Sequence, residues 1–527
     1  MLVRRRSFGF RFVAPAAGCL AIVIAIGFAP PSKRENQVNA AIKAIESRGG
    51  IVLRDNNAPA KPVVTVVWSG AGLGDRDLDS LRVLSRVRKL DLSDNSITDA
   101  GLERLASLPD LEILDLSKNR LQAAGLSALK ASINLRELDL SQNKLTDSCI
   151  DRIQIFQKLN RLNLAGNSIT GSALSRLNPL VELRELDLSS TGIDDASLAS
   201  IKKMINLETL KLDDVGCGDD AIASLVGLKK LAHLELKHSR IDDKGLSLVA
   251  SIAVLKYLDV AGSPITDKGV SKLGSARNLE SLDLSEIRLK GDGLEAIKAN
   301  QRLKSLNLAR TRFSDESLEH LVGFFSLERL SLADDPVTNA GVDRLNGLIH
   351  LRSLDLSHTE IGDRGAPNFG GMTELAALDL SNTKLGDAEL TCVRTCSKLE
   401  SLDISSTSID DSAAPFIQDI TTLKHLDVSN TGVGDRFAAA IGRLKNLRSL
   451  EIGWTNLGDA GAVHLGRITN LRELSIHRTA IGDSGLAAIA RLRYLRSLDL
   501  GATECTREGI TKLRKSLPRI KIEAGSS

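Results

Sequence analysis

Acidic side chains recur along this chain at one fixed spacing. An Asp or Glu stands between a leucine and a second aliphatic residue, usually leucine, in 13 of 18 successive segments of equal length. Ten of them are Asp91, Asp115, Asp139, Asp187, Asp259, Asp283, Asp355, Asp379, Asp403 and Asp427, and Glu235, Glu451 and Asp499 complete the set. A row of carboxylates is suited to divalent cations or to a basic protein segment. A repeated structural role of this Asp explains the pattern equally well, and both interpretations stay open.

Two groups of rarer residue types interrupt the repetition. Trp454, His477 and Arg478 fall in neighbouring segments where Ser, Gly and small polar residues are usual. Aromatic and Arg side chains are common anchors of protein interfaces, so we predict that they form one contact patch on adjacent strands. His233, His238 and Tyr257 make a second candidate protein-binding group. A chance surface arrangement is the alternative for both.

Other chemistry has little support in the sequence. We find no nucleophile with a base, no paired carboxylates of a pocket and no Gly-rich phosphate loop before a helix, so we expect no enzyme and no cofactor. Cys392 and Cys396 stand four apart on an expected helix, which could suit two metal ligands. Because no His or third Cys lies near them in sequence, we expect them to pack in the core and predict no metal site.

A leucine repeat must position these residues. The same leucine recurs at one constant interval, as Leu90, Leu114, Leu138 and onward to Leu498, which gives 18 repeats. Each approximates L-x-x-L-x-L-x-x-[N/T/S]-x-[I/L]-x-D-x-G-L-x-x-L, the leucine-rich-repeat template. In a strand, L-x-L directs both leucines inward and the residue between them outward. We therefore predict an α/β fold, a leucine-rich-repeat solenoid or horseshoe with a parallel concave sheet and short convex helices.

The repeat also predicts how its polar positions are used. The Asp after each strand is placed to cap the short helix of its own repeat, as at Asp99, Asp147, Asp195, Asp243, Asp363 and Asp483. Basic residues at the second position, such as Arg136, Arg184 and Lys256, are expected to offset repulsion within the acidic row. Val215 and Ile287 replace the Asn or Thr of the turn, so we expect local irregularity there.

The chain divides into four parts by these patterns. Residues 1–35 hold a basic segment, an export or anchor helix and a tether, and residues 36–86 an N-terminal cap with a degenerate first repeat. The cap is expected to contain a helix over 39–47 and strands over 51–53 and 63–68. Residues 87–514 are the eighteen repeats, and residues 515–527 a C-terminal cap with a final strand over 517–522.

The N-terminal segment predicts transport out of the cytoplasm. The stretch from Phe12 to Ala29 is uncharged and follows four arginines, so a helix there would span about 27 Å and orient with its N-terminus inside. We expect residues 12–29 to anchor the protein in the membrane. Cleavage after small residues near Ala29, giving a secreted or periplasmic protein, is the alternative.

Charge argues against nucleic acid as a partner. Residues 1–34 carry six basic side chains and no acid, which leaves 63 basic against 66 acidic residues in the rest. Nucleic-acid binding requires a clustered basic face, and none is evident in the repeats. We therefore expect no nucleic-acid partner.

The repeats resemble known families over about residues 36–522. They are similar to bacterial exported leucine-rich-repeat proteins of the kind abundant in planctomycetes. The element from Ile97 to Leu102, I-T-D-A-G-L, also resembles repeats of eukaryotic F-box substrate receptors, although no F-box is evident and a ubiquitin-ligase role is not carried over. The resemblance implies protein–protein binding.

We therefore expect a non-catalytic module on the extracytoplasmic side that recognises a protein or peptide on its concave face. One alternative is a structural or adhesive envelope protein that associates through its acidic stripe and cations. Another is a regulator of a small GTPase, which some repeat solenoids are, although no catalytic Arg with a recognisable context is present. The sequence leaves the identity of the ligand open.

Overall fold

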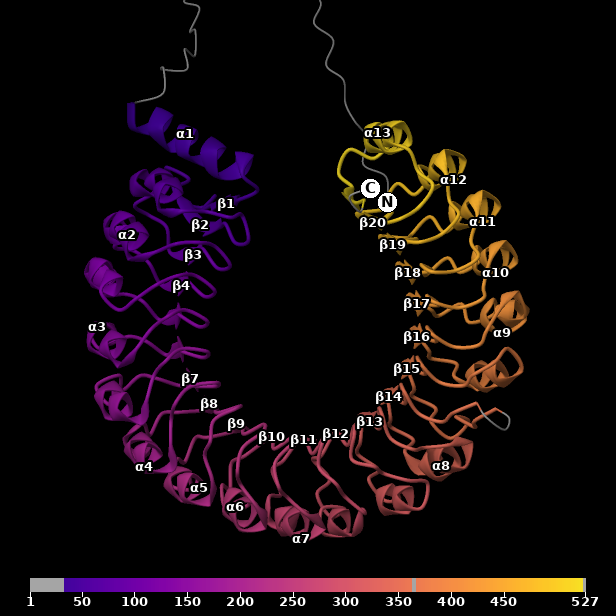
Figure 1. Cartoon of the computed structure of the whole chain (residues 1–527), viewed down its shortest axis with the longest axis horizontal. Coiled ribbons are helices and arrows are strands. Elements are labelled where there is room, and N and C mark those ends of the chain that lie inside the picture. Colours follow the sequence, from indigo (N-terminus) through magenta and orange to yellow (C-terminus); the bar gives the residue numbers. More distant parts are fainter. Residues whose placement is uncertain (1–32, 363–365, 525–527) are drawn as a thin grey trace, which may run out of the picture.

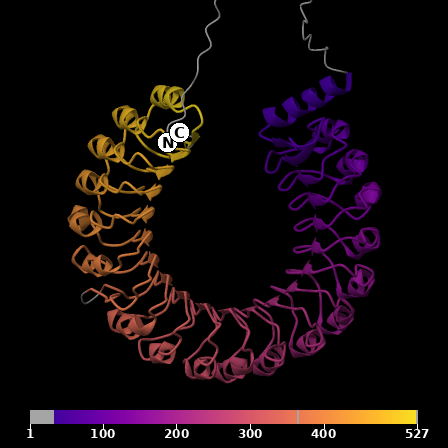
Figure 2. The ribbon, with the colours of Figure 1, turned by 180° about the vertical axis from the view of Figure 1, so that it is seen from behind.

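The chain forms an open horseshoe in the computed structural model, which describes residues 33–362 and 366–524. Short strands line its inner face and helices cover its outer face (Figure 1), as the view from behind also shows (Figure 2). The predicted leucine-rich-repeat solenoid is confirmed, including its parallel concave sheet and short convex helices.

One sheet of 21 strands runs through the described part of the chain. From β2 to β21, each strand pairs in parallel with the next in sequence, and equivalent leucines of adjacent repeats stand opposite each other, as Leu90 opposite Leu114. The strands are β1 (Ile51–Arg54), β2 (Val63–Val67), β3 (Lys89–Asp91), β4 (Ile113–Asp115), β5 (Glu137–Asp139), β6 (Arg161–Asn163), β7 (Glu185–Asp187), β8 (Thr209–Lys211), β9 (His233–Glu235), β10 (Tyr257–Asp259), β11 (Ser281–Asp283), β12 (Ser305–Asn307), β13 (Arg329–Ser331), β14 (Ser353–Asp355), β15 (Ala377–Asp379), β16 (Ser401–Asp403), β17 (His425–Asp427), β18 (Ser449–Glu451), β19 (Glu473–Ser475), β20 (Ser497–Asp499) and β21 (Lys521–Glu523).

Helices of one to four turns cover the convex side. The α-helices are α1 (Lys33–Ser47), α2 (Asp99–Leu102), α3 (Ile150–Ile153), α4 (Asp195–Leu198), α5 (Asp219–Leu225), α6 (Asp243–Val249), α7 (Asp267–Val270), α8 (Asn339–Arg344), α9 (Ala414–Ile417), α10 (Asp435–Ile441), α11 (Asp459–Leu465), α12 (Asp483–Ile489) and α13 (Arg507–Ser516). The 3-10 helices are η1 (Asp75–Val83), η2 (Glu103–Ser107), η3 (Gly125–Ala131), η4 (Asp147–Cys149), η5 (Gly171–Leu177), η6 (Ala199–Lys203), η7 (Ser271–Ser275), η8 (Asp292–Ala296), η9 (Ser317–Leu321), η10 (Leu345–Gly347), η11 (Ala388–Thr395) and η12 (Asp411–Ala413).

The core is a continuous stack of aliphatic layers between the sheet and the helices. In one repeat, Leu135, Leu138, Leu140 and Leu145 are at most 2% exposed, and the corresponding leucines of other repeats are buried alike. Replacing such a leucine by alanine costs about 2–5 kcal/mol. Val215 and Ile287 join this core, and β8 and β11 keep the common register with both neighbours. The sheet is therefore regular at both residues, whereas the convex segment after Ile287 contains Gly291 with φ +109°.

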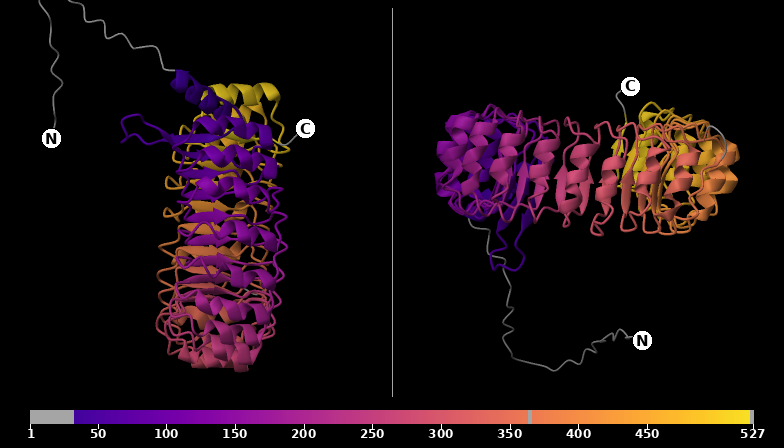
Figure 3. Two further views of the ribbon diagram at one scale, coloured as in Figure 1. Left: turned by 90° about the vertical axis from the view of Figure 1, so that its left-hand side faces the viewer. Right: turned by 90° about the horizontal axis from the view of Figure 1, so that it is seen from below.

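The N-terminal end of the solenoid is covered by α1 and β1. The predicted cap helix begins earlier than expected, at Lys33, and its Ile45 is fully buried beside Trp68. β1 pairs antiparallel with β2, and β2 carries Val66 opposite Leu90, so β2 continues the register of the repeat strands. The loop between β1 and β2 projects from one side of the solenoid (Figure 3). At the other end, β21 is a final strand that begins at Lys521, later than the strand predicted over 517–522.

The predicted membrane anchor lies outside the described residues, since residues 12–29 fall before Lys33. Within 33–362 and 366–524, no helix is both long and apolar enough to cross a membrane. The structure therefore leaves the anchor as a prediction.

The Asp that follows each strand joins neighbouring repeats. The Asp459 carboxylate, for example, accepts hydrogen bonds from the Gly482 and Gly485 N–H groups at the start of α12, at 2.8 and 2.9 Å. Other carboxylates at this position likewise accept hydrogen bonds from backbone N–H groups of the following repeat, namely those of Asp99, Asp147, Asp195, Asp243 and Asp483. The prediction that they cap their own helix was wrong, because each is the first residue of its own helical segment and reaches the next one. Asp363 lies outside the described residues.

Glycines make room for this contact. A Cβ added at Gly485 would lie 2.6 Å from Asp459 Oδ1, and one added at Gly245 would lie 2.3 Å from Asp219 Oδ1. Real side chains are never that close, so the D-x-G pattern pairs an Asp of one repeat with the Gly of the next. The two positions therefore set how closely adjacent repeats stack.

Candidate binding surface

The turn after each strand holds one residue in the left-handed conformation. This residue has φ between +52° and +66° in all 18 repeats, and glycine occupies it at Gly166 and Gly262. A residue with a Cβ costs about 1–2 kcal/mol in this conformation. Trp454 (φ +54°) and Arg478 (φ +53°) are bulky side chains placed at this position. The solenoid does not need them there, because the turn forms with glycine.

The acidic row holds these turns in place. The Asp91 carboxylate accepts from the Ser93 N–H at 3.0 Å and from the Ser93 hydroxyl at 2.7 Å. The other nine Asp residues of the predicted column accept in the same way from the N–H two residues on, at 2.8–3.0 Å. Such bonds stabilise a turn locally. The recurring Asp thus has a structural role in every repeat that carries it.

Basic residues of the second position do not neutralise this row as expected. They pair instead with acids at the same position in the neighbouring repeat, as Arg184 with Glu208 at 2.7 Å and Lys304 with Glu328 at 2.9 Å. These side chains are opposite one another on adjacent repeats, because they occupy equivalent positions. The repulsion within the acidic row is therefore offset mainly by the N–H and hydroxyl donors of the turns.

Five consecutive strands, β14 to β18, carry an acid at the central position of the row: Asp355, Asp379, Asp403, Asp427 and Glu451. Burial first, and neighbouring carboxylates second, raise the pKa of Asp379, Asp403 and Glu451. Beside them, two positions earlier, stand the smaller or neutral side chains Ser353, Ala377, Ser401, His425 and Ser449. An acidic row of mostly half-buried carboxylates thus runs along the concave face of this arm.

Trp454 and Arg478 lie in contact at the end of this surface. The Arg478 guanidinium carbon is 3.9 Å from the centroid of the Trp454 ring, which remains 48% exposed. A cation over an aromatic face contributes about 0.5–1 kcal/mol at an exposed site. The residues belong to the turns after β18 and β19 rather than to the strands themselves, which corrects the predicted placement. They therefore stand at the edge of the concave sheet.

His477 completes the group, which we call the rim patch (Trp454, His477 and Arg478). Its Nδ1 lies 2.9 Å from the Ser475 hydroxyl and 3.4 Å from Asp499 Oδ2, and its carbonyl accepts from the Trp454 N–H at 2.9 Å. A Cβ added at Gly453 would lie 2.5 Å from the His477 ring. Gly453 therefore lets the imidazole settle against the turn of the preceding repeat. The rim patch combines an aromatic surface with two side chains that can carry positive charge.

The second predicted group separates into two. His233 and Tyr257 stack on the concave sheet with ring centroids 4.0 Å apart, and His233 Nε2 lies 2.6 Å from Glu235. His238 is in the turn after β9, where it contacts Asp214 at 2.8 Å and Glu286 at 3.3 Å. In the described part of the chain, no hydrogen bond, ion pair or ring contact joins His238 to His233 or Tyr257. The stacked pair contributes to the concave face and His238 to its edge.

His238 spans two repeats because the intervening turn contains glycine. A Cβ at Gly262 would lie 2.3 Å from the His238 ring. Hydrogen bonds with Asp214 and Glu286 raise the pKa of His238, while burial and, less strongly, Lys237 oppose them. Arg310 and Lys237 also pair with Glu286, at 4.0 and 3.6 Å.

The loss of stability caused by His238→Asn should depend on pH. Because the folded-state pKa is raised above the ordinary value of 6.5, the stability that His238 contributes is fully present below pH 6.5 and is lost as the pH rises through the folded-state pKa. The urea midpoint of the variant should fall below that of the natural protein at pH 5.5 and approach it at pH 8.5. An equal deficit at both pH values would show that the imidazole acts through packing alone.

Cys392 and Cys396 belong to the core as expected. Both are buried, at 5% and 4% exposure, and burial raises the pKa of the Cys396 thiol to about 11. In residues 33–362 and 366–524, no group of three or more His, Cys, Asp or Glu is arranged to hold a metal ion. The structure thus gives these thiols a packing role.

A hollow of about 340 Å³ lies on the other arm of the concave face. Strands β4 to β8 line it, and Arg161 at its centre pairs with Glu185 at 2.6 Å and with Glu137 at 3.6 Å. Sequence reasoning missed this charged row, although the three residues occupy equivalent positions of successive repeats and so face one another on adjacent strands. Its lining carries five acids against two bases, Arg161 and Lys211, so this part of the concave face is acidic as well.

Comparisons with known proteins agree with the fold. Leucine rich repeat models match residues 85–145 and, further on, 183–202, 253–274, 347–368, 420–441, 443–466 and 467–490. The structure of the TLR13–ssRNA13 complex is similar at 17% identity and a TM-score of 0.55, over 90% of this chain and 85% of that one. The mouse RP105/MD-1 complex is similar at 16% identity and a TM-score of 0.50, over 87% and 89%. No curated protein matches. The chain therefore carries leucine-rich repeats and folds as a leucine-rich-repeat solenoid.

Proposed function

We propose that this protein is a non-catalytic binding module that recognises a protein or peptide on the concave face of its C-terminal arm. The observation that carries the proposal is the contact between Trp454 and Arg478 at two left-handed turn positions. Each bulky side chain costs the fold free energy there that glycine would avoid. Exposed Trp and Arg are also the residue types that most often anchor protein interfaces.

The surroundings favour a partner with a basic segment. The acidic run from Asp355 to Glu451 leads along neighbouring strands to the rim patch, at about 4.8 Å per strand. A basic segment laid across these strands would lower the repulsion among the carboxylates, which adds to burial in raising the pKa of Asp379, Asp403 and Glu451. Trp454 would then contact the partner at the edge of the sheet.

Capture from an envelope extract tests the proposal. The double variant Trp454→Gly, Arg478→Gly removes both anchors and leaves the turns in a conformation that glycine adopts freely. We expect it to unfold at the same temperature as the natural protein or slightly above, and to lose a discrete partner that the natural protein retains. Loss of two anchors of this kind weakens binding at least tenfold.

The matched control is Ser406→Gly, Asn430→Gly, which changes the same turn position in two preceding repeats. It should retain the partner. If the anchor variant also retains it, the rim patch is not the site. If capture is diffuse and disappears with a calcium chelator, the cation-dependent adhesive alternative replaces recognition of a partner.

We further propose that the repeats lie on the extracytoplasmic side. Support comes from the four arginines before the uncharged segment 12–29, which orient such a segment with its N-terminus inside. The division into residues 1–35, 36–86, 87–514 and 515–527 is part of the same proposal. Fractionation of cells expressing the full chain, with protease added outside the inner membrane, should degrade the repeats. Protection of the repeats would contradict this placement.

A further inference from the structure

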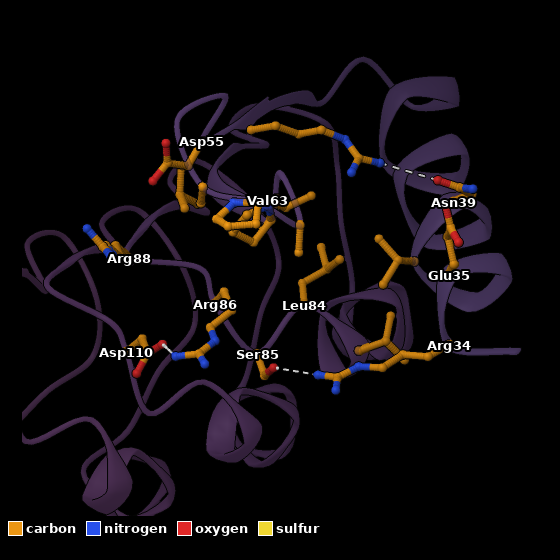
Figure 4. A pocket seen from close by; sticks show the side chains of 18 residues that line it. Arg34, Glu35, Asn39, Asp55, Val63, Leu84, Ser85, Arg86, Arg88 and Asp110 are labelled. Atoms are coloured by element: carbon orange, nitrogen blue, oxygen red, sulfur yellow. Dashed lines mark hydrogen bonds and ion pairs between the residues drawn. The ribbon is translucent and has the colours of Figure 1, made fainter. Parts of the chain in front are cut away.

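A cavity of about 910 Å³ opens at the N-terminal end of the horseshoe, on the arm opposite the rim patch. Three segments enclose it: α1, the β1–β2 loop and the stretch 83–88 that leads into β3. Figure 4 shows Arg34 and Asn39 reaching into it from α1, with Arg86 and Arg88 on the opposite side. Its volume is in the range of sites that bind small ligands or short peptide segments.

Two guanidinium groups in its wall are held by neutral acceptors. Arg34 donates to the Ser85 hydroxyl at 3.2 Å, and Arg54 donates to the Lys61 carbonyl at 3.0 Å and to Asn39 Oδ1 at 3.3 Å. These bonds orient the side chains without neutralising them. Four arginines (Arg34, Arg54, Arg86 and Arg88) and three acids (Glu35, Asp55 and Asp110) line the cavity, which leaves positive charge in excess. Arg86 differs, because it pairs with the Asp110 carboxylate at 3.1 Å. A guanidinium has five N–H donors, so Arg34 and Arg54 retain donors for a ligand.

The floor of the cavity is apolar and firmly supported. Val63 and Leu84 are 4% and 3% exposed and lie between the arginines in Figure 4. Val38 and Val83 are partly buried and pack against the same core. α1 is held in turn by Ile45, which is fully buried. A ligand would therefore meet a preformed apolar surface with charged groups at its edge.

We propose that this cavity binds an extended segment of a partner protein in which aliphatic and acidic residues alternate. The aliphatic side chains would lie on the partly exposed Val38 and Val83, and the carboxylates would accept hydrogen bonds from Arg34 and Arg54. A carboxylate is the favoured partner of a guanidinium, because two of its N–H groups match the two oxygens. This site is separate from the rim patch and does not depend on the function proposed for it.

Fluorescence anisotropy on the full chain tests the proposal with three labelled hexapeptides: alternating Leu and Glu, Leu and Ser, and Leu and Lys. We expect saturable binding of the Leu/Glu peptide and at least tenfold weaker binding of the other two. The double variant Arg34→Gln, Arg54→Gln should lower the affinity for the Leu/Glu peptide about tenfold or more, since a hydrogen bond to a charged group is lost at each position. Trp454→Gly, Arg478→Gly should bind it as the natural protein does.

Controls separate this site from general charge and from misfolding. Arg120→Gln, Arg277→Gln removes two exposed arginines elsewhere and should leave the affinity within twofold. Within residues 33–362 and 366–524, the Arg34 side chain donates to Ser85 alone, so Arg34→Gln should unfold at the natural temperature and still weaken the binding of the Leu/Glu peptide. Any one of three results would overturn the proposal. The Leu/Ser peptide could bind as tightly as the Leu/Glu peptide, or Arg34→Gln could leave the affinity for the Leu/Glu peptide unchanged. Arg120→Gln, Arg277→Gln could also lower that affinity as much as Arg34→Gln, Arg54→Gln does.

Discussion

Gly293→Ala should destabilise the solenoid by about 3 kcal/mol, because the repeats have no room for a methyl group at that point. Its Cβ would lie 2.3 Å from the Asp267 carbonyl oxygen and 2.9 Å from Val270 Cβ. A backbone carbonyl cannot rotate away as the end of a flexible side chain can. The urea midpoint should therefore fall, and amide exchange should quicken around η8 and α7 first, since each repeat contacts mainly its neighbours.

Gly227→Ala is the matched control. A Cβ at Gly227 would have no atom within 4 Å, and its φ lies outside the left-handed range. The change should be neutral or should stabilise by about 0.5 kcal/mol through the unfolded chain. If both substitutions have the same small effect, the close stacking of repeats through glycine is not what holds them in register.

Asp335→Asn should stabilise the protein at pH 8 by about 3 kcal/mol, because it removes a carboxylate that is charged and buried at that pH. Asp335 is 2% exposed, and burial raises its pKa to about 7 although it accepts hydrogen bonds from the Arg312 and Phe313 N–H groups. Asn is the natural residue at this position in four repeats, at Asn95, Asn119, Asn143 and Asn167, where its oxygen accepts in the same way and its amide donates to strand carbonyls. The amide therefore suits the site without a charge.

The sign of the pH dependence follows from the raised pKa. The folded state binds the Asp335 proton more tightly than the unfolded chain, whose pKa is near 3.8, so the stability of the natural protein falls as the pH rises from about 4 to 7. The Asn variant lacks this loss. Its advantage in urea midpoint should be small at pH 4.5, grow to pH 7 and then level off.

Asp334→Asn serves as the control, because Asp334 is 37% exposed and pairs with Arg310 at 3.0 Å. It should show no advantage that grows over this range. A constant advantage of Asp335→Asn at every pH would mean that the amide acts by shape rather than by removing a buried charge.

The register of the fold could be predicted because one spacing repeats without error. Leu90 to Leu498 determine every strand position, and Val66 and Ile522 extend the same pattern to β2 and β21. The cap helix was found by its apolar face, although its start at Lys33 was not. An amphipathic pattern marks the residues that pack on the core, and the first turn of α1 contains only exposed side chains.

The side-chain contacts between repeats could not be predicted as readily. The left-handed turn position carries residues as different as Lys118, Gln142 and Ser190, so it has no composition that signals its conformation. The reach of Asp459 into the next repeat depends on how closely two repeats stack, which the pattern within one repeat does not contain. By contrast, the contact of Trp454 with Arg478 follows from their equivalent positions in adjacent repeats, and the same rule would have found the pair Arg184 and Glu208.

Photo-crosslinking from two faces of the same arm tests the central claim most directly. A benzophenone side chain would replace Asn430, in the turn next to Trp454, or Val463, which is 40% exposed on the convex helix α11. In an envelope extract, the Asn430 position should give a discrete protein adduct that disappears when Trp454 and Arg478 are both glycine, and the Val463 position should not give that adduct. The same adduct from both faces, or its persistence without the two anchors, would contradict recognition at the rim patch.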